Sequence, residues 1–181
     1  MHIGRLAARA VIGSLFIGHG TQKLFGSFGG PGLEGTDGMM QALSMHPPRR
    51  NSLAAGWAET AGGALVVAGL ATPLAASLLT ANMVTAIRKV HFSNGPWAAN
   101  GGWEYNGVLI AALTALVETG PGDLSLDAVV AKRLHGPGWA LTALFTGITA
   151  STVAIEVGRR SAPAGGSGPA PDTAGDPVTR D

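Results

Sequence analysis

Seven polar side chains near the ends of apolar stretches could bind a polar ligand or transfer protons. They are His19, Gln22, Lys23, Glu59, Arg88, His91 and Glu104. His19, Gln22 and Lys23 are spaced at i, i+3 and i+4, so they would share one face of a helix. Arg88 and His91 are three residues apart and would share a face of another helix. Ionisable groups inside apolar helices are functional hypotheses, so these residues are candidates for ligand binding or proton relay.

Glu59 is the most unusual of the seven, because it is the only charged residue between Leu53 and Ile87. A carboxylate in such an apolar run has to be paired, protonated or given a polar ligand. One interpretation is a proton relay with a neighbouring histidine. A second is a site for the carbonyl oxygens of a quinone head group. A third is a structural ion pair with Arg88 or Lys23.

Other chemistries match the sequence less well. The chain has no cysteine, which excludes disulfides, thiolate catalysis and cysteine-ligated clusters. Two histidines on apolar helices could ligate haem iron, but this pattern is unspecific. There is no Glu-x-x-His pair for a two-metal site and no Ser-His-Asp arrangement. Basic patches with interleaved aromatic residues are also missing. The sequence therefore predicts no metal site, no nucleic-acid partner and no evident cofactor, although a quinone could bind.

The composition indicates a protein surrounded by lipid. Only 13% of the residues are charged, against about 25% in soluble domains, and 46% are hydrophobic. We therefore expect an all-α integral membrane helical bundle. Its four core transmembrane helices are predicted at about residues 6–25, 53–70, 74–92 and 104–117. A fifth apolar stretch, residues 136–155, is also long enough to span a membrane.

Alternation of these helices would gather the candidate residues at one end. The loops after the first and third helices then lie on the same side, and all seven residues lie towards it. His19 and Glu59 would each be about 9 Å from the end of their helix. The opposite end, around Thr72-Pro73, carries far less charge. We thus predict one polar half with Glu59 at the floor of a one-sided pocket, and one plain half.

Smaller features complete the predicted topology. Residues 36–45 could form a short interfacial helix. The alanines and glycines of the second predicted helix favour close helix packing and could leave room for a quinone head group. Asp123 or Ser125 could cap a short helix. Basic residues are nearly balanced between the two ends, which leaves the membrane orientation open.

Several short motifs occur together in an order typical of one family. They are Gly18-His19-Gly20-Thr21-Gln22-Lys23-Leu24-Phe25-Gly26, Gly29-Gly30-Pro31-Gly32, Ala58-Glu59-Thr60-Ala61-Gly62-Gly63, Gly69-Leu70-Ala71-Thr72-Pro73, Met83, His91 with Gly95, Gly102-Trp103-Glu104-Tyr105, Gly120-Pro121-Gly122 and Leu126-Asp127. Over about residues 5–127, the chain resembles the DoxX family of small bacterial membrane proteins. Six candidate residues lie within or beside these motifs, and Arg88 is the one that the resemblance does not include.

The resemblance implies a four-helix, multi-pass protein of the inner (plasma) membrane that is associated with redox complexes. The family takes its name from a subunit of a thiosulfate:quinone oxidoreductase. Relatives are linked to oxidative-stress complexes that recruit superoxide dismutase and a sulfurtransferase. The family is also distantly similar to the SURF-four cargo receptors, so the fold alone does not fix an activity.

Together, the residues and the resemblance predict three parts. Residues 1–127 form the DoxX-like membrane domain, residues 128–160 an added segment with a transmembrane helix, and residues 161–181 a disordered tail. The expected function is a non-catalytic membrane subunit of an oxidoreductase complex, with membrane lipid, redox proteins and a quinone-like or small polar ligand as partners. A small-molecule transport protein and a structural scaffold are the alternatives.

Overall fold

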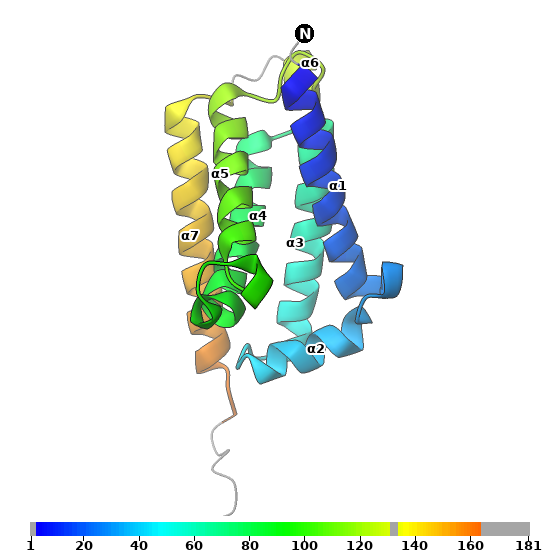
Figure 1. Ribbon diagram of the computed structural model, residues 1–181, viewed down its shortest axis with the longest axis vertical. Coiled ribbons are helices and arrows are strands. Elements are labelled where there is room, and N and C mark those ends of the chain that lie inside the picture. The colour runs from blue at the N-terminus through cyan, green and yellow to red at the C-terminus, as the bar shows by residue number, and fades with distance from the viewer. Residues whose placement is uncertain (1–2, 131–133, 164–181) are drawn as a thin grey trace, which may run out of the picture.

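The computed structural model describes residues 3–130 and 134–163, and all regular structure in these ranges is helical. Five long helices run alternately up and down (Figure 1). They are α1 (Ile3–Phe25), α3 (Pro48–Ala68), α4 (Thr72–Ala86), α5 (Glu104–Thr119) and α7 (Pro137–Arg160). The predicted all-α fold is therefore confirmed. Most of the predicted tail lies outside the described residues.

Four of the five predicted apolar stretches correspond closely to these helices, and the second has a shifted start. α3 begins at Pro48 rather than near Leu53, because Pro48 occupies the first turn, where its missing N–H is not needed. α4 continues through a π-helical segment, Ile87–His91, which extends it to the predicted end. The predicted break at Thr72-Pro73 is confirmed, since α4 starts there.

α1 and α3 approach until their backbones are in contact. A Cβ atom added to Gly13 would lie 2.6 Å from the Gly63 carbonyl oxygen, so only glycine fits there. On another side of α3, an added Cβ at Gly62 would lie 2.9 Å from the Leu79 side chain of α4. The prediction of close packing is thus confirmed. Gly62 and Gly63 of α3 are covered by α4 and α1, whereas Ala54, Ala61 and Ala64 of the same helix are exposed.

α4 lies at the centre of the bundle and packs against α3, α5 and α7. Its Leu79 is fully buried together with Leu113 of α5. α7 packs closely along α4, because a Cβ atom at Gly147 would lie 2.7 Å from the Thr80 side chain. A hydrogen bond of 2.8 Å between Thr85 and Ser151 also joins the two helices. The C-terminal helix is therefore part of the same packed bundle.

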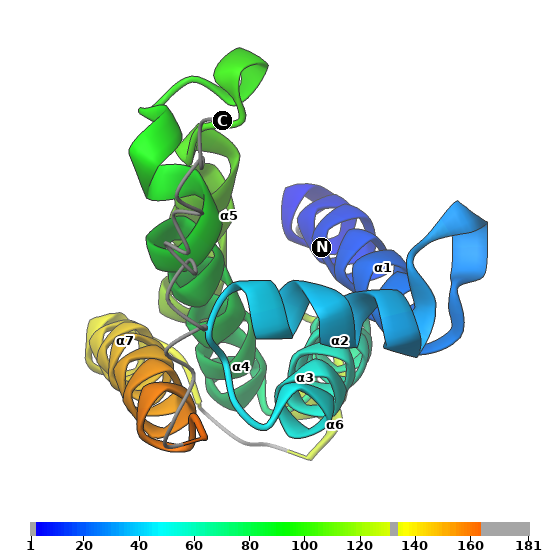
Figure 2. The same cartoon turned by 90° about the horizontal axis from the view of Figure 1, so that it is seen from below.

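Short helices cover the lower end of the bundle. α2 (Gly32–Ala42) corresponds to the predicted interfacial helix and begins four residues earlier than expected. It crosses the end of α3 (Figure 2) and buries Thr36 and Met40 against the bundle. The connection between α4 and α5 contains the short 3-10 helices Phe92–Asn94 and Ala98–Asn100. This lower end is the one on which the candidate residues were expected.

The upper end is not the plain half that the sequence suggested. Arg9 of α1 is buried there and donates hydrogen bonds to the carbonyl oxygens of Val66 (3.0 Å), Pro121 (2.9 Å) and Leu124 (2.7 Å). These carbonyls belong to the end of α3 and to the α5–α6 connection. One arginine therefore ties three segments together, so the half that was predicted to be plain contains a buried, hydrogen-bonded charge.

Asp127 of the short helix α6 (Leu126–Val129) completes the upper end. Its carboxylate accepts hydrogen bonds from the backbone N–H groups of Ala71 (2.9 Å) and Thr72 (3.2 Å) and from the Thr72 hydroxyl (3.0 Å). It thereby caps the first turn of α4, where backbone donors have no partner within the helix. Ser125 caps α6 as predicted, since its hydroxyl accepts from the Ala128 N–H at 3.2 Å.

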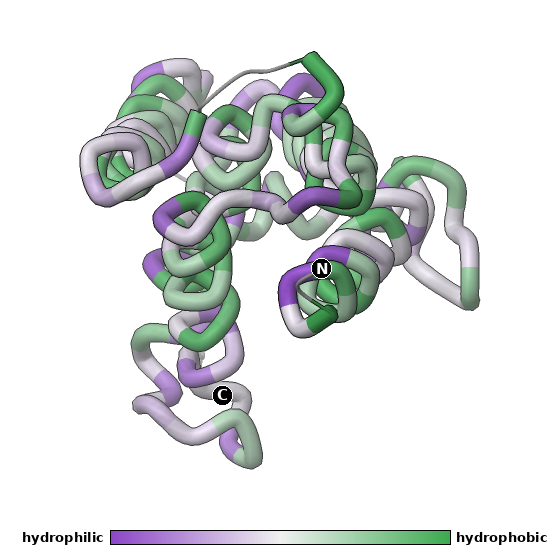
Figure 3. The backbone as a smooth tube through the Cα atoms, turned by 90° about the horizontal axis from the view of Figure 1, so that it is seen from above, coloured by the Kyte–Doolittle hydropathy of each residue, from purple (hydrophilic) through white to green (hydrophobic). Residues whose placement is uncertain are grey.

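The outside of the bundle is largely apolar. Exposed large hydrophobic side chains include Val11, Trp57, Val108 and Phe145, and hydrophobic residues recur along every long helix (Figure 3). By length and composition, one helix within the described residues is a candidate membrane span, namely α7. α4 and α5, with 15 and 16 residues, are shorter than a usual span. The number of membrane-spanning helices therefore stays a prediction.

Candidate functional site

A cavity of about 410 Å³ opens in the lower half of the bundle. Its walls come from α1, α3, α4 and α5 and from the connection between α4 and α5. Leu15, Phe16 and Leu109 give it apolar walls. The volume lies within the range typical of small-molecule sites. The predicted one-sided pocket thus has a counterpart in the fold.

Four of the seven candidate residues line this cavity, and they come from α1, α3 and the π-helical segment that follows α4. They are His19, Lys23, Glu59 and His91. The alternation of the helices brings them together, because the lower ends of α1 and α4 meet the lower half of α3. An ion pair between Lys23 and Glu59 and the two imidazole rings therefore face the same cavity.

Glu59 is buried, and its Oε2 forms an ion pair with the Lys23 ammonium group. The two side chains are 5% and 21% exposed, so the lysine is the partner nearer to the opening. Of the two cations that the sequence offered for this pair, Lys23 is therefore the one used. Lysine has three N–H donors, and one of them serves Glu59. The pair keeps hydrogen-bonding capacity for a ligand.

The two histidines are held by hydrogen bonds through the same ring nitrogen. Nδ1 of His91 lies 2.7 Å from the Gly101 carbonyl oxygen, and Nδ1 of His19 lies 3.2 Å from Oε1 of Gln22. A backbone carbonyl oxygen only accepts, so Nδ1 of His91 carries the proton. In the neutral His91 ring Nε2 is then an acceptor, and in a charged ring it is a donor. Gln22 contacts the His19 ring and does not itself line the cavity.

Two candidate residues have other roles. Arg88 points to α7, where it donates a hydrogen bond of 3.0 Å to the Thr152 hydroxyl. Glu104 accepts a hydrogen bond of 3.0 Å from the Ala98 N–H and so holds the α4–α5 connection in place. Neither lines the cavity. Both residues were expected in the polar cluster, but the Arg88 side chain is directed to α7 and the Glu104 side chain to the α4–α5 connection.

The cavity also contains residues that the site prediction omitted. Asn106 is buried, lines the cavity beside Tyr105, and its amide nitrogen lies 3.3 Å from the sulfur of Met83. A thioether is a weak acceptor, so this amide retains donor capacity for a better partner. An amide side chain within the largely apolar α5 is the feature of the sequence that marks this residue.

The arrangement suits hydrogen bonding and proton exchange. Among residues 3–130 and 134–163, no three His, Asp or Glu side chains are grouped so as to hold a metal ion. The cavity combines a cation, a carboxylate, two imidazoles and an amide with apolar walls. Such a lining fits a small, partly apolar ligand with polar oxygen atoms.

The fold and the site define an all-helical bundle that has an apolar exterior and a polar cavity at one end. Residues 4–92 match the DoxX family model. The chain belongs to the DoxX family, which is a family of membrane proteins. No match was found among curated proteins or among solved structures.

The matched segment covers α1 to the end of the π-helical segment after α4. It includes the Lys23–Glu59 pair and both cavity histidines. α5, with Glu104 and Asn106, lies beyond the match, so the resemblance up to residue 127 stays a prediction. The segment that matches the family model therefore forms one side of the cavity, and α5 with the connection before it forms the other.

Proposed function

We propose that this protein is a multi-pass subunit of the plasma membrane that binds a quinone-like ligand and supports a partner oxidoreductase. The observation that carries this proposal is the cavity around Glu59. It joins an apolar wall to donors and acceptors that belong to four helices. A quinone head group needs both, since its ring is apolar and its carbonyl oxygens accept hydrogen bonds.

The residues have complementary tasks in this proposal. The Lys23 ammonium and the Asn106 amide can donate to quinone oxygens. As the quinone takes up two electrons, its two oxygens also take up two protons, and the charged rings of His19 and His91 can each donate one from Nε2. Electrons come from the partner oxidoreductase, and this chain binds the ligand and exchanges its protons. This division of tasks agrees with a non-catalytic subunit.

The upper end of the bundle supports binding rather than passage of a solute. Arg9 closes that end by joining α1, α3 and the α5–α6 connection through buried hydrogen bonds. A transport protein would have to open this network in each cycle. Transport is therefore the second candidate, and it predicts flux in proteoliposomes that disappears in a Glu59→Gln variant.

Purification of the full chain from membranes in mild detergent tests the proposal. Mass spectrometry of the co-purified lipids and proteins should recover a quinone and a redox protein with the wild type. Asn106→Leu should lose the quinone, because it removes a donor while keeping a similar volume. Glu104→Gln is the matched control, since Glu104 lies outside the cavity. Recovery of neither a quinone nor a redox protein would contradict the proposal.

A further inference from the structure

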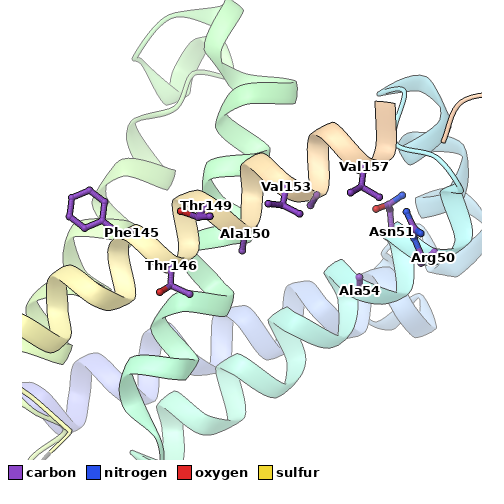
Figure 4. A pocket seen from close by; sticks show the side chains of 10 residues that line it. Arg50, Asn51, Ala54, Phe145, Thr146, Thr149, Ala150, Val153 and Val157 are labelled. Atoms are coloured by element: carbon purple, nitrogen blue, oxygen red, sulfur yellow. The ribbon is translucent and has the colours of Figure 1, made fainter. Parts of the chain in front are cut away.

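A second hollow, of about 710 Å³, lies on the outside of the bundle between α3 and α7. Figure 4 shows Thr146, Ala150 and Val153 of α7 along this groove, with Ala54 of α3 on its other side. Val157 and Arg50 lie together at one end of it. The lining is mostly apolar or small, and it contains one charged side chain.

The groove exists because α3 and α7 both pack on α4 and diverge from each other. A hydrogen bond of 3.1 Å, donated by the side-chain amide of Asn82 to the Ala55 carbonyl oxygen, joins α4 to α3. The hydrogen bond from Thr85 to Ser151 joins α4 to α7. Between these two contacts, alanine side chains leave the space unfilled. The hollow is thus fixed by the packing of three helices.

Arg50 gives the groove a cationic mouth. Its guanidinium donates to the carbonyl oxygen of His46, 3.3 Å away, and makes no ion pair within the described ranges. The neighbouring Arg49 is different, because it forms an ion pair of 2.8 Å with Asp37. Of these two adjacent arginines, Arg49 is paired with a carboxylate, and Arg50 at the groove is available for an anion.

The length of the groove fits one leaflet of a bilayer. From Val157 to Phe145, α7 rises about 18 Å, and half of a hydrocarbon core is about 15 Å. Arg50 lies at the lower end, where the chain leaves the apolar region. An arginine at that level can bind a phosphate group through two N–H donors.

We propose that this groove binds an acyl chain of an anionic phospholipid, with the lipid phosphate on Arg50. The charge at the mouth and the leaflet length favour this occupant over a helix of a second copy, which would leave the guanidinium without an anion. The proposal rests on the membrane location in the proposed function, but it is independent of the quinone cavity. It assigns a lipid-binding role to α7.

Native mass spectrometry of the full chain in detergent tests this proposal. The probes are dioleoyl phosphatidylglycerol and dioleoyl phosphatidylcholine, which have the same acyl chains. The wild type should retain the anionic lipid preferentially, and Arg50→Gln should reduce that preference about fivefold, as expected for one basic residue near a headgroup. Arg49→Gln removes the same charge from the neighbouring position and should leave the preference unchanged.

A second pair of variants tests the groove itself. Ala154→Phe fills it at an exposed position and should reduce the retention of both lipids. Leu141→Phe, exposed on the same helix but outside the groove, should have no effect. Equal losses with Arg49→Gln and Arg50→Gln, or a dimer that Ala154→Phe dissociates, would overturn the proposal. Lipid retention without any quinone would overturn the proposed function alone.

Discussion

Replacing Lys23 by methionine removes the cation that neutralises the buried Glu59 carboxylate. Breaking a buried ion pair from one side usually costs about 3–5 kcal/mol. Lys23 is 21% exposed beside a cavity that can admit water, so we expect a smaller loss of about 2–3 kcal/mol in the free energy of unfolding. For a chain of this size, that loss lowers the melting temperature by roughly 5–10 °C.

The double variant Lys23→Met/Glu59→Leu distinguishes pairing from mere loss of a side chain. Apolar replacement of a whole buried pair is often neutral or stabilising. We therefore expect the double variant to recover most of the stability that Lys23→Met loses. Thermal unfolding in detergent, followed by tryptophan fluorescence, measures all three proteins under the same conditions.

The same variants separate a ligand site from a scaffold. If the pair serves only stability, the double variant should behave as the wild type in quinone retention. If the cavity binds a ligand, the double variant should be stable and yet lose the quinone. A Lys23→Met variant that unfolds within 1 °C of the wild type would refute the energetic reasoning.

Three further predictions concern packing, capping and orientation. Gly13→Ala should lower the stability by about 1–3 kcal/mol through overpacking against α3, whereas Gly18→Ala, which meets nothing within 4 Å, should be neutral or stabilising in the same unfolding assay. Asp127→Ala should cost about 1–3 kcal/mol by leaving buried donors of α4 unpaired, and slower hydrogen exchange at those donors than in the wild type would contradict this. The lower end should face the cytoplasm, because α7 adds Arg159 and Arg160 to the basic residues there and Arg9 of the upper end is buried; C-terminal reporter fusions can check this, and a reporter active only outside would contradict it.

The helical fold and the grouping of four site residues could be predicted from the sequence, because both follow from apolar stretches and their alternation. His19 and Lys23 share a face of α1 by spacing alone, and alternation places them opposite Glu59. The orientation of Arg88 could not be predicted. A residue near a helix end can turn towards either neighbour, and the sequence does not show that α7 lies beside it.

The hydrogen bonds of the buried Arg9 at the upper end could not be predicted from the sequence for a related reason. An arginine near the start of an apolar helix usually extends into the membrane interface, whereas Arg9 is buried. Its carbonyl partners come from distant parts of the chain and lack any sequence signature, since every residue has a carbonyl. Asp127, in contrast, occurs in a Ser-x-Asp pattern, but its role depends on α4 starting beside it.

Arg9 and Lys23 lie near opposite ends of α1, and the partners of each explain the difference between the two ends of the bundle. Arg9 gives its donors to backbone carbonyls that hold segments together, so little capacity is left for a ligand. Lys23 gives one of three donors to Glu59 and stands at a cavity. A rigid guanidinium fork suits a permanent junction, whereas an ammonium group on a flexible stem can exchange partners. The lower end is therefore where a ligand can enter without dismantling the fold.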